Sequence, residues 1–208
     1  MKLFLSSEAK HPESMRKLET FVNGFEGKRI AYIPTAANGE EPFGTWKTGK
    51  TWNLVNTLGA EVTPMLLEDY TKTNFPGSLK DKDIIWMAGG MCGYLMYWIR
   101  RTQLDNYLVE LLDNGLIYVG SSAGSMITAK TLYPACIPLN EPEIGAEVIP
   151  GLGLVDFDFY PHFEEEMFEP LKKVYKGNKM YLVKNGDVIT ICDGILKILG
   201  KERVIENL

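Results

Sequence analysis

Residues 116–126, Leu-Ile-Tyr-Val-Gly-Ser-Ser-Ala-Gly-Ser-Met, decide the expected fold of this chain. The first four are apolar, β-branched or aromatic, which is typical of one buried strand. Residues 120–124 match the pattern G-x-S-x-G, and residues 125–130 are compatible with a helix. A strand, a tight glycine-flanked turn and a helix together form a nucleophile elbow, which exposes its middle serine above the sheet. That serine is Ser122, although serine is also a common helix N-cap.

Apolar runs before this turn alternate with segments of helical spacing. The runs predict strands over residues 2–7, 29–35, 62–67 and 84–87. Near-continuous apolar strands are typical of a parallel sheet that is buried on both faces. We therefore predict an α/β fold with a mostly parallel, doubly wound sheet, in a single domain over residues 1–208. Ligands bind such sheets beyond the carboxyl ends of the strands, where both Ser122 and Gly89-Gly90 are expected.

Two pairs of turn residues mark the C-terminal part of the chain. Asn185-Gly186 lies between apolar runs over residues 180–183 and 188–192, and this pattern is the strongest short signal for a β-hairpin. Asp193-Gly194 indicates another turn, before the apolar residues 195–199. The sequence therefore predicts a C-terminal hairpin that turns at Asn185-Gly186.

The composition is that of an ordinary globular protein, and it argues against several classes of function. The formal net charge is −5 and no run of lysine or arginine occurs, so no nucleic-acid partner is expected. Three separated cysteines and only two histidines indicate neither a disulfide framework nor a metal site, and no cofactor is expected. Residues 1–5 are too short an apolar stretch for a signal peptide or membrane span, so a cytoplasmic protein with no membrane partner is the default expectation. The sequence does not predict an oligomeric state.

A serine hydroxyl becomes a good nucleophile only when an adjacent base takes its proton. His162 lies in a loop-like Tyr160-Pro161-His162-Phe163 and is better placed for this than His11, which precedes a helix. A carboxylate is then needed to orient the imidazole ring. Four acidic residues between the serine and the histidine are candidates, and spacing does not choose among them: Glu141, Glu143, Asp156 and Asp158.

Six landmarks occur in order along nearly the whole chain. They are residues 1–7, residues 32–36 (Tyr-Ile-Pro-Thr-Ala), Gly89-Gly90, residues 119–125, Pro161-His162-Phe163 and Asp193-Gly194. Together they resemble the peptidase E (α-aspartyl dipeptidase) family of serine peptidases. The resemblance implies a fold like that of class I glutamine amidotransferases, with serine in place of their cysteine. It also implies hydrolysis of short peptides, dipeptides with N-terminal aspartate above all, through an acyl-enzyme.

The resemblance further implies roles for individual residues. Ser122 would be the nucleophile and His162 the base, and the backbone N–H groups of Gly90 and Ala123 would form the oxyanion hole. The family's acid lies in a short Asn-acidic-Pro context, which residues 140–142 match, so Glu141 is predicted to complete the triad.

One departure from the family concerns the substrate pocket. The paired glycines of the family are usually followed by Asn-Thr, whereas Met91-Cys92 follows Gly90 here. These softer, less polar side chains predict a weaker demand for aspartate than peptidase E shows.

Two other interpretations remain open. An α/β-hydrolase esterase uses the same elbow and the same order of serine, acid and histidine, but it is usually longer, and its His-Gly-Gly-Gly motif is absent from this sequence. A binding module could keep the same fold without catalysis. A glutamine amidotransferase is disfavoured, because Ser122 stands where that enzyme needs cysteine.

Overall fold

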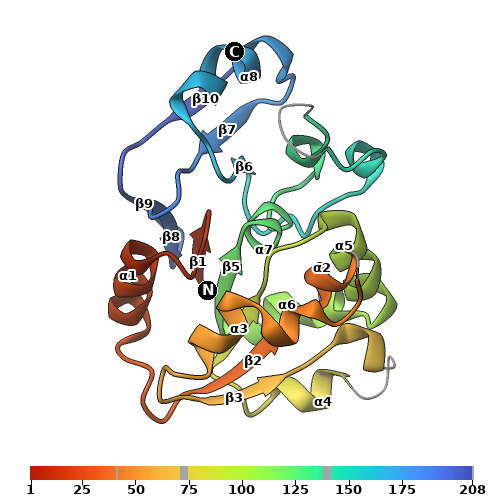
Figure 1. The fold of residues 1–208 in the computed structure, drawn as a ribbon, viewed down its shortest axis with the longest axis vertical. Helices are drawn as coiled ribbons and strands as arrows, with labels where there is room; N and C mark the ends of the chain where they lie inside the picture. The colour runs from red at the N-terminus through yellow and green to blue at the C-terminus, as the bar shows by residue number, and fades with distance from the viewer. Residues whose placement is uncertain (41, 71–74, 138–141, 208) are drawn as a thin grey trace.

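A computed structural model describes residues 1–40, 42–70, 75–137 and 142–207 of the chain. Seven strands form the larger of two sheets, in the order β3-β2-β4-β5-β1-β8-β9 (Figure 1). Their bounds are β1 (Lys2–Ser6), β2 (Arg29–Ile33), β3 (Glu61–Pro64), β4 (Ile84–Met87), β5 (Ile117–Ser121), β8 (Val188–Cys192) and β9 (Ile195–Leu199). The first five strands in this order run parallel, and β8 and β9 are antiparallel to their neighbours. The predicted α/β fold with a mostly parallel sheet is thereby confirmed.

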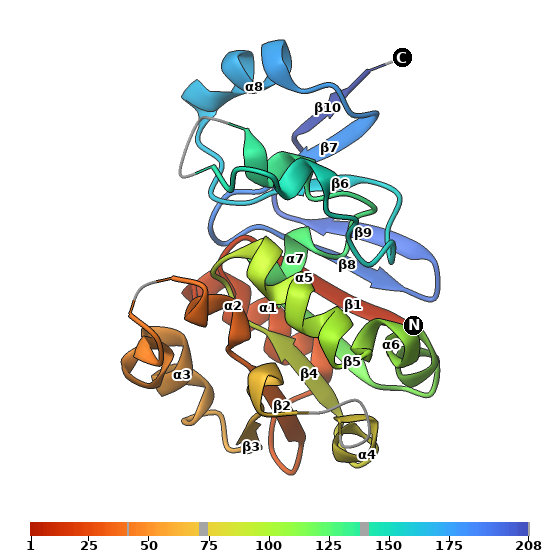
Figure 2. The same ribbon diagram turned by 90° about the vertical axis from the view of Figure 1, so that its right-hand side faces the viewer.

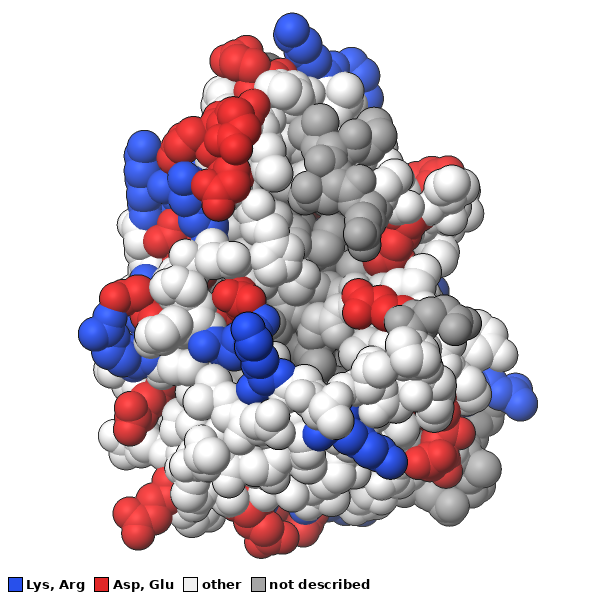
Figure 3. Space-filling view, in the orientation of Figure 1, with Lys and Arg blue, Asp and Glu red and all other residues white. Residues whose placement is uncertain are grey.

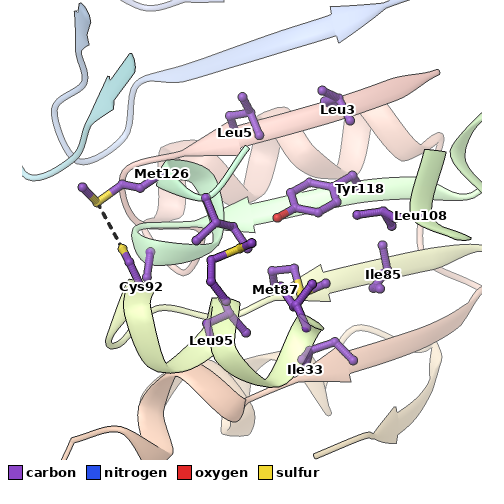
Figure 4. Close-up of a cluster of buried hydrophobic side chains, with 14 of the residues drawn as sticks. Leu3, Leu5, Ile33, Ile85, Met87, Cys92, Leu95, Leu108, Tyr118 and Met126 are labelled. Carbon is purple, nitrogen blue, oxygen red and sulfur yellow. Dashed lines mark hydrogen bonds between the residues drawn. The ribbon is translucent and has the colours of Figure 1, made fainter. Parts of the chain in front are cut away.

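Helices cover both faces of this sheet, as the near-continuous apolar strands predicted. One face packs against α4 (Phe75–Leu79), α5 (Cys92–Arg101) and α6 (Leu104–Asp113). Figure 4 shows Tyr118 and Met87 on that face, turned toward Leu95 and Leu108. The opposite face packs against α1 (Pro12–Val22) and α3 (Lys50–Val55). Two further helices, α2 (Thr35–Asn38) and α7 (Ala123–Met126), follow directly at the carboxyl ends of β2 and β5. None of the helices in the described ranges is long and apolar enough to cross a bilayer.

A smaller sheet lies at one end of the molecule, above β8 and β9 in Figures 1 and 2. Its strands are β6 (Asp158–Tyr160), β7 (Lys179–Leu182) and β10 (Val204–Glu206), in the order β10-β7-β6. Helix α8 (Phe168–Val174) contributes Leu171 to a separate hydrophobic cluster with Met180 and Leu182 of β7. The remaining helical turns are of the 3₁₀ type, at Thr45–Thr48, Leu67–Asp69, Tyr133–Cys136, Ala146–Val148 and Glu165–Met167.

The prediction of a hairpin at Asn185-Gly186 is wrong, because β7 and β8 belong to different sheets. Strand β7 buries Met180 and Leu182 in the cluster of α8 and pairs with β6 and β10, whereas β8 pairs with β1 and β9 in the larger sheet. The segment at Asn185 therefore crosses from one sheet to the other. The C-terminal hairpin is instead β8–β9, which turns at Asp193-Gly194. Both turn residues have positive φ, 50° and 82°, as a two-residue hairpin loop of type I′ requires.

The contact between α7 and β4 leaves no room for a side chain at Gly124. A Cβ atom added there would lie 2.2 Å from the carbonyl oxygen of Met87. We therefore expect Gly124→Ala to lower the free energy of unfolding by about 2–4 kcal/mol, measured by urea denaturation. Gly77→Ala in α4 is the control, because its added Cβ meets no described heavy atom within 4 Å and alanine favours a helix. Equal urea midpoints for Gly124→Ala and the unmodified protein would contradict this packing.

Candidate active site

Ser122 occupies the sharp turn between β5 and α7. Its backbone angles, φ 50° and ψ −114°, are sparsely populated for any residue except glycine. Such a conformation costs on the order of 1–3 kcal/mol and persists only where the surroundings impose it. Here the N–H of Ser122 donates to the carbonyl oxygen of Ser6, at 3.0 Å, and the following helix is wedged against β4 through Gly124. The sequence-predicted nucleophile elbow is therefore present in its strained form.

The two neighbouring serines serve the scaffold. The Oγ of Ser121 accepts a hydrogen bond from the N–H of Ala9 at 3.0 Å, and the Oγ of Ser125 donates to the carbonyl of Ser6 at 2.8 Å. Both side chains are buried. Ser122, in contrast, lines a cavity of about 1190 Å³.

His162 reaches Ser122 from the other sheet. It follows β6, with a φ of 55° that turns the chain, and its backbone N–H donates to the Oγ of Ser7 at 2.7 Å. The ring places Nε2 2.9 Å from the Oγ of Ser122. The structure thus brings together the serine and the histidine that the sequence singled out, although 40 positions separate them along the chain.

Asn185 holds the other side of the imidazole ring. Its Oδ1 lies 2.9 Å from Nδ1 of His162 and also accepts a hydrogen bond from the Oγ of Ser7 at 2.8 Å. An amide oxygen can only accept, so Nδ1 carries the proton and donates it. Nε2 then has its lone pair directed at the hydroxyl of Ser122, which is the tautomer that a general base needs. The sequence did not predict a role for Asn185, because Asn-Gly is typical of a hairpin turn. It did not predict a role for Ser7 either.

None of the described acidic candidates for the triad makes a hydrogen bond to His162. Glu141 lies outside the described residues, so its assignment as the acid of the triad stays a prediction. Glu143 accepts backbone hydrogen bonds from Cys92 and Gly93 at the start of α5. Asp158 accepts a hydrogen bond from the hydroxyl of Tyr175 at 2.7 Å, and burial raises the pKa of its carboxyl group. Asp156 and Asp158 line a separate cavity of about 380 Å³.

The backbone N–H groups of Gly90 and Ala123, which the sequence predicts as the oxyanion hole, lie beside Ser122 and make no hydrogen bond to another described residue. Gly90 has a φ of 137°, and a Cβ there would lie 2.3 Å from the carbonyl carbon and oxygen of Ala36, so only glycine fits. A Cβ built on Gly89 would lie 3.2 Å from the Cβ of Ser122, which shows how closely the paired glycines border the elbow. Both donors can therefore serve a ligand at Ser122.

The cavity at Ser122 measures about 1190 Å³ and lies between the larger sheet and residues that precede the smaller one. Figure 3 shows the surface hollowed between the upper and lower parts of the molecule. Its lining comprises Glu40, Gly90, Met91, Cys92, Gly93, Tyr94, Ser122, Met126, Pro134, Ala135, Ile137, Pro142, Glu143, Ile144, Ala146, Ile149, Tyr160, Pro161 and His162. No group of three or more potential metal-ligating side chains occurs among the residues that the structure describes.

Cys92 is the other nucleophilic group near the cavity, and its environment makes it unreactive. The residue is 1% exposed, and burial raises the pKa of its thiol well above the usual range. Its Sγ lies 3.7 Å from the Sδ of Met126, as the dashed line in Figure 4 marks. The thiol therefore stays neutral near pH 7, and the thiolate that would attack a carbonyl is scarce.

Comparison with known proteins assigns the chain to a family. The model of peptidase family S51 matches residues 3–199. The chain belongs to peptidase family S51. It is a serine peptidase, as the landmarks of the sequence indicated.

Relatives in this family match over most of the chain. An uncharacterised peptidase of Listeria monocytogenes is 27% identical over 212 residues, covering 99% of this chain and 98% of its own. Peptidase E of Streptomyces coelicolor is 28% identical over 166 residues, covering 77% of this chain and 63% of its own. A crystal structure of a candidate peptidase E from Listeria monocytogenes superposes with a TM-score of 0.76 at 24% identity, covering 100% of this chain and 98% of that one. That likeness confirms the fold.

The arrangement of the three serines predicts a single reactive hydroxyl. A fluorophosphonate probe should modify Ser122 alone, because Ser121 and Ser125 are buried and engaged in hydrogen bonds. Peptide mapping by mass spectrometry locates the adduct. Ser122→Ala should abolish labelling, and Ser121→Ala should retain it. An adduct on Ser125 would overturn this assignment.

Proposed function

We propose that this S51 peptidase hydrolyses short peptides through an acyl-enzyme on Ser122. The observation that supports it most is the 2.9 Å contact between Oγ of Ser122 and Nε2 of His162, at a strained turn beside a cavity. As Oγ attacks the scissile carbonyl carbon, His162 takes the hydroxyl proton and then passes it to the leaving amine nitrogen. The amine departs as the first product. Water, deprotonated by the same imidazole, then attacks the acyl-enzyme and releases the acid product.

The N–H groups of Gly90 and Ala123 would stabilise the negative charge that develops on the carbonyl oxygen. Both are fixed by the backbone, so they need no reorganisation during the reaction. Removal of one such donor typically costs about 3 kcal/mol of transition-state stabilisation. The close packing of Gly90 on Ala36 supports a fixed position for its N–H.

Asn185 would act as the positioning residue for His162. It holds Nδ1–H, and with it the ring orientation, without supplying a negative charge. Cysteine peptidases of the papain type use an asparagine in the same relation to their histidine. Glu141 remains the alternative that the resemblance to peptidase E favours.

The substrate preference is a finer proposal. The resemblance implies dipeptides with N-terminal aspartate, and the name of the Streptomyces relative agrees with that family. The proposal of a weaker demand for aspartate is supported by Met91, which lines the cavity and is 36% exposed. Because the chain is an S51 serine peptidase, the esterase interpretation has no further support, and turnover of any peptide excludes a non-catalytic binding module.

Replacement of the base gives the first test of this mechanism. We expect His162→Ala to lower kcat on the order of 10⁴-fold or more, with KM changed less, because the base acts on the chemical step. The activity of the unmodified enzyme should increase with pH, because only a neutral imidazole can act as the general base. His11→Ala is the matched control and should keep full activity. A large loss in the control, with activity retained in His162→Ala, would mean that the base is misassigned.

Replacement of Asn185 separates the two candidates for the orienting residue. Asn185→Ala should lower kcat on the order of 10²-fold, because the ring can then leave the productive geometry. Asn185→Asp should keep the acceptor and shift the rise in activity to higher pH, because a carboxylate favours the protonated imidazole. The pH profile of kcat measures both effects. If Glu141→Gln causes the larger loss, and Asn185→Ala is close to the unmodified enzyme, the orienting role belongs to Glu141.

A further inference from the structure

A carboxylate of the chain itself occupies the start of α5, in the wall of the cavity. The Oε1 of Glu143 accepts a hydrogen bond from the N–H of Cys92 at 2.6 Å, and Oε2 accepts one from Gly93 at 2.8 Å. Two converging backbone N–H groups at a helix start are an arrangement that binds anions. In this chain Glu143 already takes both donors, so they are not available to an acidic group of a substrate.

Two carboxylates line the described part of the cavity, where His162 is the one basic side chain. Glu40 and Glu143 both line it, whereas no lysine or arginine does so among the residues that the structure describes. Acidic groups border the hollow in Figure 3 as well. A carboxylate that enters this space loses water and meets like charge, and both effects disfavour its binding.

Large apolar side chains make up much of the remaining wall: Met91, Met126, Ile137, Ile144 and Ile149. Two of them are notably open to solvent, because Ile144 is 98% exposed and Met91 is 36% exposed. An apolar ligand group would remove this surface from water, which favours binding in proportion to the area covered.

The acyl-enzyme intermediate determines which substrate side chain would face this apolar wall. In the acyl-enzyme, the side chain of the acyl residue branches from the Cα atom that is bonded to the carbonyl carbon. The oxygen of that carbonyl faces the N–H of Gly90, and residues 91–93 continue directly from Gly90 along the cavity. The N-terminal residue of a cleaved dipeptide is the acyl residue, so its side chain would contact the wall that Met91 and Glu143 line.

We propose that this cavity selects peptides with an uncharged, apolar N-terminal side chain and excludes acidic ones, and that Glu143 sets this selectivity. The proposal rests on the proposed function, the cleavage of short peptides at Ser122. Glu143 excludes an acid in two ways: it fills the donors at the start of α5, and it adds its own charge. This selectivity goes beyond the weaker demand for aspartate proposed above, because it is opposite to the preference of an α-aspartyl dipeptidase.

The test is a dipeptide series with a constant C-terminal leucine, so that the terminal charges cancel in each comparison. We expect kcat/KM for Leu-Leu and Met-Leu to exceed that for Asp-Leu and Glu-Leu by at least about 10-fold, the scale of one like-charge contact. Asn-Leu controls for the size and polarity of aspartate and should be cleaved faster than Asp-Leu. The difference between Asp-Leu and Asn-Leu should shrink in high salt, because salt screens the repulsion.

Glu143→Gln tests the residue itself, since it keeps the shape and one acceptor and removes the charge. We expect the Leu-Leu to Asp-Leu ratio of kcat/KM to fall several-fold. Glu147→Gln is the matched control: Glu147 is close in the sequence, contacts the thiol of Cys136 and lines the second cavity. The Leu-Leu to Asp-Leu ratio of kcat/KM for Glu147→Gln should equal that of the unmodified enzyme. Thermal melting shows whether each variant folds. The salt dependence is measured on the unmodified enzyme, so it tests the repulsion even if a variant does not fold.

The possible outcomes separate this proposal from the proposed function. Faster cleavage of Asp-Leu than of Leu-Leu overturns the selectivity and leaves the peptidase mechanism in place. An unchanged ratio in a folded Glu143→Gln enzyme overturns the role of Glu143. Absence of turnover for every peptide, despite labelling of Ser122, overturns the proposed function and the selectivity with it.

Discussion

The contact between Ser122 and His162 links the larger sheet to the smaller one at the site. Ser122 directly follows β5 of the larger sheet, and His162 follows β6 of the smaller one. The two sheets share a hydrophobic cluster, because Phe159 of β6 and Tyr181 of β7 belong to the same cluster as Leu3 and Leu5 of β1. The segment that crosses between β7 and β8 then holds the imidazole ring, since Asn185 is hydrogen-bonded to both His162 and Ser7. The crossing segment is therefore part of the site as well as part of the connection.

Contacts on three sides maintain the strained backbone conformation of Ser122. The N–H of Ser122 is bonded to the end of β1, and the hydroxyl of Tyr118 in β5 donates to the carbonyl of Gly124 at 2.6 Å. Helix α7 in turn lies against β4 at Met87. An unusual backbone conformation survives when its neighbours over-determine it in this way. The elbow thus keeps its hydroxyl in place before any substrate arrives, which is the condition for preorganised catalysis.

The sequence predicted those parts of the fold and site that depend on local patterns. The apolar strands, the doubly wound arrangement, the elbow at Ser122 and the turn at Asp193-Gly194 each follow from neighbouring residues. The prediction of a hairpin at Asn185-Gly186 failed because two apolar runs look alike whether they pair with each other or, as here, pair within different sheets. Asn185 was missed for a related reason, since the orienting group was sought only among carboxylates between the serine and the histidine. Glu143 was on that list, but its partners at the start of α5 exist only in the folded chain.

The distance in sequence between Ser7 and Asn185, 178 positions, has a consequence for the cell that makes the protein. While the chain is being synthesised, the elbow and even His162 emerge well before the residue that fixes the imidazole. Strand β8 must then pair with β1, a long-range contact of the kind that forms late in folding. A chain that lacks its last strands therefore also lacks the contact that holds the imidazole ring of His162.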